Sequence, residues 1–241
     1  MRTLLYRTFF ILSLAVFSVI AVNTQAAPKV PEWLVNVENP LANDGIHCTG
    51  ALVGKSWVLT TEECTRYSLH SLSIKFADNE DITPEAVSVI SKKEHGKVSL
   101  LKLSGELERE IVKLSSYSET SPCETWFCHY FMRINPQSML VSSVKLKHVS
   151  HKHQSVQPVR CRQLFPHIEH LFCTNPHTDT GYAEDDKLIR AAALVDEQGK
   201  LAGLGIVNRE AIPGQTHGFN FFLPLDRYRS FITATLAEKE L

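Results

Sequence analysis

Eleven histidines are the first side chains in this sequence of 241 residues that could do chemistry. Two groups of three lie close together in the chain: His148, His151 and His153, and His167, His170 and His177. On a β-strand, His151 and His153 would share a face, because alternate side chains point the same way. Zinc would need two further ligands at about 2.0–2.1 Å, and the spacings match no established zinc pattern. We therefore expect exposed loop histidines and no metal or other cofactor.

An acidic run is the next candidate for a binding site. It consists of Glu184, Asp185 and Asp186. Such a run could form a cation site or the acidic floor of a substrate pocket, yet no neighbouring residue type positions it for either role. A solvated acidic loop is the usual meaning of three consecutive carboxylates.

Six cysteines could supply thiol chemistry or disulfide bonds. They are Cys48, Cys64, Cys123, Cys128, Cys161 and Cys173. All six follow a segment that is typical of a secretory signal. An even set of cysteines in an oxidising compartment favours three disulfide bonds over thiols.

The N-terminal segment has the layout of a signal peptide. Arg2 and Arg7 form a basic region, Phe9–Val22 is an apolar run, and small residues with a polar break follow at 24–27. The run is shorter than the roughly 20 apolar residues of a transmembrane helix. We expect a signal peptide over residues 1–26, cleaved after Ala26 or Ala27, and a secreted, extracellular protein. An uncleaved anchor is the main alternative.

The remaining residues, 27–241, suit one sizeable domain or two small ones sharing a core, and no Pro-rich or Gly-rich linker divides them. The net charge is −1 and the charged residues are scattered along the chain. No basic stripe favours a nucleic acid partner, and no polybasic segment favours a membrane surface.

Short apolar stretches separated by polar turns predict an all-β architecture. The expected strands are Trp33–Val37, Ala51–Val53, Trp57–Thr60, Leu72–Phe76, Val87–Ile90, Val98–Leu103, Phe127–Ile134, Met139–Leu146, Arg190–Val195, Leu201–Val207 and Phe219–Leu223. One helix is expected after Pro224, where apolar residues recur at intervals of three and four.

Two cysteines 16 residues apart bracket a strand with a specific pattern. The segments are His47–Val53, with Cys48-Thr49-Gly50-Ala51-Leu52-Val53, and Lys55–Cys64, with Trp57-Val58-Leu59-Thr60. They resemble the first barrel of the trypsin/chymotrypsin-like serine proteases. In that family a cysteine followed by Gly-Gly-Ser-Leu-Ile leads through Trp-Val-Leu-Thr-Ala-Ala-His-Cys.

Further matches follow in the family's order along the chain. They are Trp33-Leu34-Val35, Val98–Leu103, Cys161, Phe172-Cys173, Ala193-Leu194-Val195, Gly199–Val207, and Tyr228 with Phe231 and Ile232. The resemblance implies two antiparallel six-stranded β-barrels with a C-terminal α-helix, forming one protease-like domain over residues 27–241. The alternative is an unrelated β-sandwich that mimics one disulfide loop.

The resemblance also locates the three positions of a Ser-His-Asp triad, and each carries another residue. Glu63 stands at the base position, and a carboxylate with a pKa near 4.3 is a weak base at neutral pH. Lys97 stands at the position of the orienting Asp, with the opposite charge. Aligning Ala191–Val195 to the family's Gly-Gly-Pro-Leu-Val places Arg190 at the nucleophile. We therefore expect no catalytic residues of this kind.

The loss of the nucleophile does not depend on that alignment. From Gly181 to Gln215 the chain contains no Ser, Thr or Cys. In the aligned register Leu188 replaces the first Gly and Ile189 the Asp of the family's Gly-Asp-Ser-Gly-Gly. This change also removes the turn that shapes the oxyanion hole.

The family gives counterparts for two of the three expected disulfide bonds, Cys48–Cys64 and Cys161–Cys173. Cys123 lies where the family sends a long disulfide to the strand near Asp196, but that strand has no cysteine. The remaining pair, Cys123–Cys128, would form a small local loop.

These features indicate an inactive secreted serine protease homologue, similar to those of insects that have no clip domain. It would act by binding an unidentified secreted or cell-surface protein, for instance in immune or reproductive fluid. A hydrolase with relocated catalytic residues is the alternative, and a structural role is a third. We also expect Glu63 to pair with Lys97, because a carboxylate in a shielded cleft is costly without a cation.

Overall fold

The computed structural model describes residues 30–38, 47–66, 69–78, 81–117, 125–133, 146–156, 170–176, 189–210 and 219–238. The expected signal peptide lies outside these residues. None of the helices formed by the described residues is long and apolar enough to cross a membrane.

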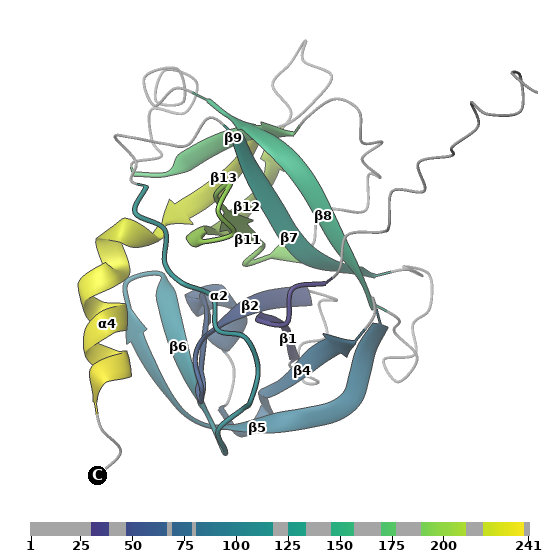
Figure 1. The fold of residues 1–241 in the computed structure, drawn as a ribbon, viewed down its shortest axis with the longest axis vertical. Helices are drawn as coiled ribbons and strands as arrows, with labels where there is room; N and C mark the ends of the chain where they lie inside the picture. Colours follow the sequence, from purple (N-terminus) through teal and green to yellow (C-terminus); the bar gives the residue numbers. More distant parts are fainter. Residues whose placement is uncertain are drawn as a thin grey trace, which may run out of the picture.

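The first half of the chain forms a closed antiparallel barrel, drawn in blue and purple in Figure 1. Its hydrogen-bonded order is β4-β1-β2-β3-β6-β5, and pairing of β4 with β5 closes it. The strands are β1 (Leu34–Glu38), β2 (His47–Gly54), β3 (Trp57–Thr61), β4 (Ser73–Asp78), β5 (Asp81–His95) and β6 (Val98–Leu103).

The second half forms another closed antiparallel barrel, drawn in green to yellow above the first in Figure 1. Its order is β8-β7-β11-β12-β13-β9, closed by pairing of β8 with β9. The strands are β7 (Thr125–Arg133), β8 (Leu146–Ser155), β9 (Phe172–Pro176), β11 (Ala193–Val195), β12 (Leu201–Glu210) and β13 (Phe219–Pro224). The expected pair of six-stranded barrels is confirmed.

A main hydrophobic core fills the first barrel and continues to the second. Inside the first barrel, Val35, Val37 and Val58 surround Gly50, where an added Cβ would lie 2.8–3.0 Å from their methyl groups. The same core includes Phe131 on β7 and several residues of β11 and β12. Apolar side chains therefore tie the two barrels together across their junction.

The C-terminal helix crosses back onto the first barrel, as the left side of Figure 1 shows. A 3-10 turn, η4 (Leu225–Tyr228), leads into α4 (Arg229–Ala237). Ile232 is fully buried in the main core, and a Cβ added to Gly54 would lie 3.0 Å from Leu236. The helix expected after Pro224 is confirmed.

Strands β8 and β9 are the parts of the second barrel that the apolar pattern did not predict. The stretch expected at Met139–Leu146 lies almost entirely outside the described residues, and β8 begins where it ends. The residues of β8 are mostly polar, with three histidines, and β9 spans only Phe172–Pro176. Pairing with β7 and β13 overrides the weak local signal in each strand.

We predict that Gly50→Ala lowers the free energy of unfolding by about 1–3 kcal/mol, because overpacking a filled core strains its neighbours. Equilibrium denaturation in urea measures the change. Gly105→Ala is the matched control, since an added Cβ at Gly105 has no neighbour within 4 Å. An equal effect of both substitutions would contradict the packing around Gly50.

Candidate functional site

Glu63 lies on a single helical turn that follows β3 directly, α2 (Glu62–Thr65). Its side chain is partly exposed at the barrel junction. The next residue, Cys64, is bonded to Cys48 at the start of β2, with the two Cα atoms 5.7 Å apart. The first predicted disulfide is thus confirmed, and it fixes the position of Glu63 relative to β2.

A polar network holds α2 against β5 and β6. The buried hydroxyl of Thr65 lies 2.8 Å from the Ser99 hydroxyl and donates to the Glu94 carboxylate at 2.9 Å. Lys92 donates to the same carboxylate at 2.8 Å and to the Thr65 carbonyl at 3.0 Å. These bonds lower the pKa of Glu94, and the bond from Lys92 contributes most.

Lys97 lies in the tight turn between β5 and β6. Gly96 precedes it with φ +58°, a conformation that favours glycine, and an added Cβ would lie 3.3 Å from the ring of Tyr228. His95 packs against Tyr228 and Phe231, with ring centroids 6.1 and 5.3 Å away. The C-terminal residues therefore fix this turn. Its backbone reaches α2, because the Glu62 amide donates to the Lys97 carbonyl at 2.9 Å.

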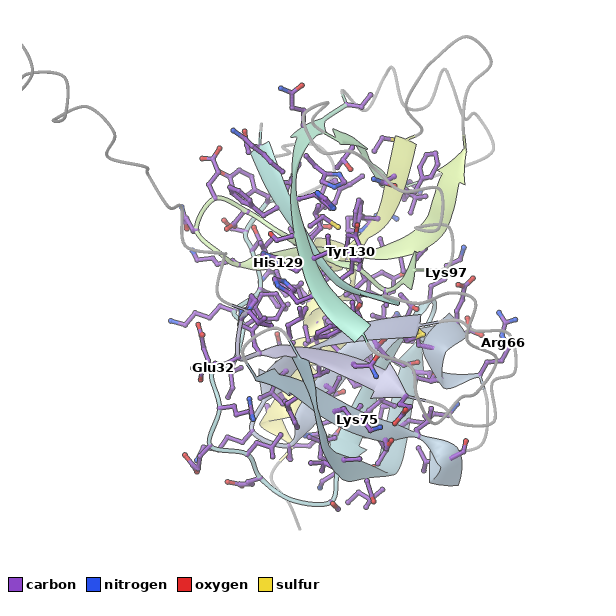
Figure 2. All side chains as sticks on the ribbon, turned by 90° about the vertical axis from the view of Figure 1, so that its right-hand side faces the viewer. Glu32, Arg66, Lys75, Lys97, His129 and Tyr130 are labelled. Atoms are coloured by element: carbon purple, nitrogen blue, oxygen red, sulfur yellow. A yellow bond between two sulfur atoms is a disulfide. The ribbon has the colours of Figure 1, made fainter. Side chains whose placement is uncertain are left out.

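The side chain of Lys97 is exposed, and Figure 2 shows it towards the same edge of the molecule as Arg66. Among the contacts that the structure describes, Lys97 makes no ion pair with Glu63. The expected Glu63–Lys97 pair is therefore wrong. The turn brings the backbone of Lys97 to α2 but leaves its ammonium group in water, where a charge needs no protein partner.

Arg190 reaches the same place through its backbone. The two-residue strand β10 (Ile189–Arg190) runs parallel to β2, with Ile189 opposite His47 and Arg190 opposite Cys48. Arg190 therefore lies beside the disulfide bond that anchors Glu63. The side chain of Arg190 and all of Leu188 lie outside the described residues, so their part in the site stays a prediction.

Ala191 follows in the left-handed region, with φ 57°, and is completely buried. Its amide donates to the Gly205 carbonyl at 2.8 Å, and the Gly205 amide donates to the Ala192 carbonyl at 2.8 Å. A residue with a Cβ is strained in this region by about 1–2 kcal/mol. The aligned family pattern has glycine at Ala191, so this conformation agrees with the register that puts Arg190 at the nucleophile position.

The hydroxyl groups on β3 and α2 are all engaged in the interior. Thr60 donates to the Thr49 carbonyl at 2.9 Å, and Thr61 donates to the Cys64 sulfur at 3.4 Å. Thr60, Thr61 and Thr65 are at most 1% exposed. None of the three is presented to a substrate as a nucleophile.

The second barrel does not have the predicted Cys123–Cys128 bond. Cys128 is a buried thiol, not half of a disulfide, and it belongs to the core around Trp126. Extended strand β7 carries the chain about 3.3 Å per residue away from its start at Thr125, whereas a disulfide needs Cα atoms within about 7 Å. Cys173 is disulfide-bonded, and its partner is one of Cys123 and Cys161, which lie outside the described residues.

Asp196 was given no role from the sequence, yet it is a buried structural carboxylate at 2% exposure. It accepts hydrogen bonds from the Ser115 hydroxyl at 2.6 Å and from the amides of Gln198 and Lys200 at 2.8 and 3.0 Å. These bonds tie the segment between the barrels to the turn from β11 to β12. The Asp-x-x-Gly pattern ending at Gly199, typical of a turn, is the sequence signal that could have found it.

The candidate metal ligands that the structure describes form no metal site. No group of three His, Cys, Asp or Glu side chains suited to a metal occurs within the described part of the chain. On β8, His153 lies 2.9 Å from the Thr174 hydroxyl, and the His151 ring is tilted against Tyr130 with centroids 5.8 Å apart. His148 and His153 are buried strand residues, so the expectation of exposed loop histidines is wrong for these two. His148 points to the opposite face from His151, since three residues separate them on a strand. His167, His177 and the run Glu184–Asp186 lie outside the described residues.

His129 also has a strongly perturbed environment, and the sequence gives no signal for it. Its Nδ1 lies 3.2 Å from Nε2 of His148, the two rings are nearly parallel, and Trp33 packs edge-on at 5.9 Å. Figure 2 shows His129 between the two barrels. Burial, with a smaller contribution from His148, lowers the pKa of His129 to about 3. This environment depends on His148 of the neighbouring strand β8, so the residues next to His129 in the sequence do not indicate it.

No protein-family model and no curated protein matches the sequence. Solved structures do match the coordinates. Kallikrein-related peptidase 10 in complex with Zn²⁺ is 18% identical, with a TM-score of 0.66 over 88% of this chain and 99% of that one. The chain has the chymotrypsin-like fold.

Two further neighbours with this chymotrypsin-like fold are 16% identical to the chain. Scabies mite inactivated protease paralogue S-D1 has a TM-score of 0.63 over 87% of this chain and 96% of that one. Neuropsin from mouse brain has a TM-score of 0.62 over the same shares. At these identities the likeness extends to the fold.

We predict that Ala191→Gly raises the free energy of unfolding by about 0.5–1 kcal/mol, because glycine relieves the left-handed strain. Ala193→Gly, two residues along in β11, is the control and should lower it by about 1 kcal/mol. Thermal or urea unfolding of the two variants measures the difference. A loss of stability in both would show that Ala191 is not strained.

We also predict that the protein loses stability as pH falls from about 6.5 to about 3. Over this range unfolded His129 takes up a proton that the folded state excludes, and each unit of pKa difference is worth about 1.4 kcal/mol. His129→Gln should flatten this part of the profile. The exposed His95→Gln should leave it unchanged, and an unchanged slope in His129→Gln would contradict the assignment.

Proposed function

We propose that the protein is a secreted, non-catalytic serine protease homologue that acts by binding another secreted or cell-surface protein. The observation that carries this proposal is the convergence of three backbone positions at one disulfide. Glu63 adjoins Cys64, Arg190 pairs with Cys48, and the Lys97 carbonyl binds the amide of Glu62. The protease-like framework is kept while a carboxylate and two cations replace the triad expected from the resemblance.

Two further features support the absence of catalysis. The buried hydroxyls on β3 and α2 serve the fold, and the segment from Gly181 to Gln215 offers no nucleophile. Two structural neighbours are themselves described as inactivated protease paralogues of the scabies mite. Because function depends on the side chains at a site and not on the fold, a protease-like fold without its triad can act by binding another protein.

The binding surface that we propose surrounds α2 and the turn at Lys97. The side chains of Glu62, Arg66 and Lys97 are exposed there. A partner that covers this region would contact charges carried by α2 and by the turn at Lys97, whose backbones are hydrogen-bonded to each other. The N-terminal layout described above supports secretion, so the partner would be extracellular.

Crosslinking with mass spectrometry tests the surface directly, with the purified chain as bait in a secreted protein fraction. The double variant Arg66→Glu/Lys97→Glu should lose the captured partner. Lys113→Glu, at an exposed position on the segment between the barrels, should keep it. Capture that survives the double variant would place the binding surface elsewhere, and turnover of a peptide library by the wild-type chain would refute the proposal.

We predict that the triple variant Glu63→His, Lys97→Asp and Arg190→Ser does not cleave peptide substrates. The expected Gly-to-Leu188 and Asp-to-Ile189 changes remove the oxyanion turn, and losing even one oxyanion donor costs about 100-fold or more in turnover. A peptide-library assay with trypsin as the positive control measures this. Detectable cleavage by the triple variant would show that the turn is functional and that the three substitutions alone caused inactivity.

A further inference from the structure

Two buried polar side chains at the barrel junction have oxygens without a hydrogen-bond partner. They are Asn36 on β1, at 3% exposure, and Thr49 on β2, at 1% exposure. Neither the Asn36 Oδ1 nor the Thr49 Oγ1 makes a hydrogen bond with the protein. An unsatisfied buried polar group costs about 1–3 kcal/mol, so a pair of them requires an explanation.

The two side chains face each other. Asn36 and Thr49 are direct partners in the antiparallel ladder of β1 and β2, and the Cβ atoms of such a pair lie about 4.5–5.5 Å apart. At this spacing the two oxygens can be bridged by one small molecule. The β-branched Thr49 has few rotamers, and its carbonyl already accepts the Thr60 hydroxyl at 2.9 Å.

Both side chains lie on the outer face of the first barrel. The opposite face of β2 points inwards, because Gly50 is surrounded by Val35, Val37 and Val58. The outer face is nevertheless buried, since β2 contacts β7, β10 and β11 of the second barrel. The pair is therefore enclosed between the barrels.

The segment that pairs with β2 beside Thr49 continues with small residues. Arg190 pairs with Cys48, and the next residues are the small and buried Ala191, Ala192 and Ala193. Thr49 also stands where the trypsin-like pattern has glycine, so its hydroxyl is a feature of this chain. Asn36 and Thr49 therefore form a buried polar pair with small apolar residues nearby.

We propose that this polar pair is the binding site of one internal water molecule that bridges Asn36 and Thr49. The Thr49 hydroxyl donates to the water oxygen, and the water donates one proton to the Asn36 Oδ1. Buried waters typically make two to four such bonds to groups that the protein leaves unsatisfied. The inference is independent of the proposed function, because it concerns how the two barrels are joined.

Nuclear Overhauser spectroscopy on the full isotope-labelled chain tests the site. A long-lived water should give cross-peaks to the Thr49 amide and methyl group and to the Asn36 side-chain amide. Thr49→Ser, which keeps the hydroxyl, should keep the cross-peak to the Asn36 amide. Absence of these cross-peaks in the wild-type protein would overturn the proposal, and this measurement does not require any variant to fold.

Denaturation provides a second test, because the sign of the stability change in Thr49→Val shows whether the Thr49 hydroxyl makes a hydrogen bond. Thr49→Val should raise the unfolding equilibrium constant at least about fivefold, because it removes one anchor of the water and leaves Asn36 unsatisfied. Adding Asn36→Leu should recover part of this loss, since both polar partners are then absent. If Thr49→Val leaves the stability unchanged or raises it, the Thr49 hydroxyl makes no hydrogen bond in the wild-type protein. Destabilisation without a water cross-peak would mean a direct bond; either result refutes the bridging water.

Discussion

The disulfide bond between Cys48 and Cys64 is the constraint on which the candidate site depends. It joins the start of β2 to the single turn α2, and so fixes Glu63 and the backbone of Arg190 within one small region. The backbone bond between Glu62 and Lys97 brings in the third position. This framework is built from main-chain and sulfur atoms, so it tolerates any side chain at the three positions. The chymotrypsin-like framework therefore does not require the side chains of a catalytic triad.

Much of the fold could be predicted from the sequence, because β1, β2, β3 and β6 of the first barrel are buried on nearly every described residue. The expected strand Val98–Leu103 coincides with β6, and the Cys48–Cys64 bond is the one that the resemblance to the trypsin-like proteases implies. Strand β8 could not be predicted in this way. Its polar, histidine-rich residues are held by long-range pairing with β7, and such pairing leaves no local pattern.

The side chains of the site were harder to predict than its backbone. The sequence places Lys97 correctly next to α2, but charge complementarity alone could not show that the turn leaves its ammonium group in solvent. Counting cysteines likewise favoured a bond at Cys128, whereas the strand directs this thiol into the core. Asp196 and His129 gain their roles from partners 81 and 19 residues away. Contacts at such separations are set by the topology of the barrels, which a local sequence pattern does not reveal.

Intact-mass analysis after treatment with a fluorophosphonate probe is the measurement that tests the central claim most directly. Such probes react covalently with an activated serine and leave an unactivated one unchanged, because the nucleophile must be deprotonated by a neighbouring base. We predict that the folded, disulfide-bonded chain shows no added mass under conditions that label trypsin completely. A stoichiometric adduct that peptide mapping assigns to any serine would contradict the claim that the protein is not an enzyme.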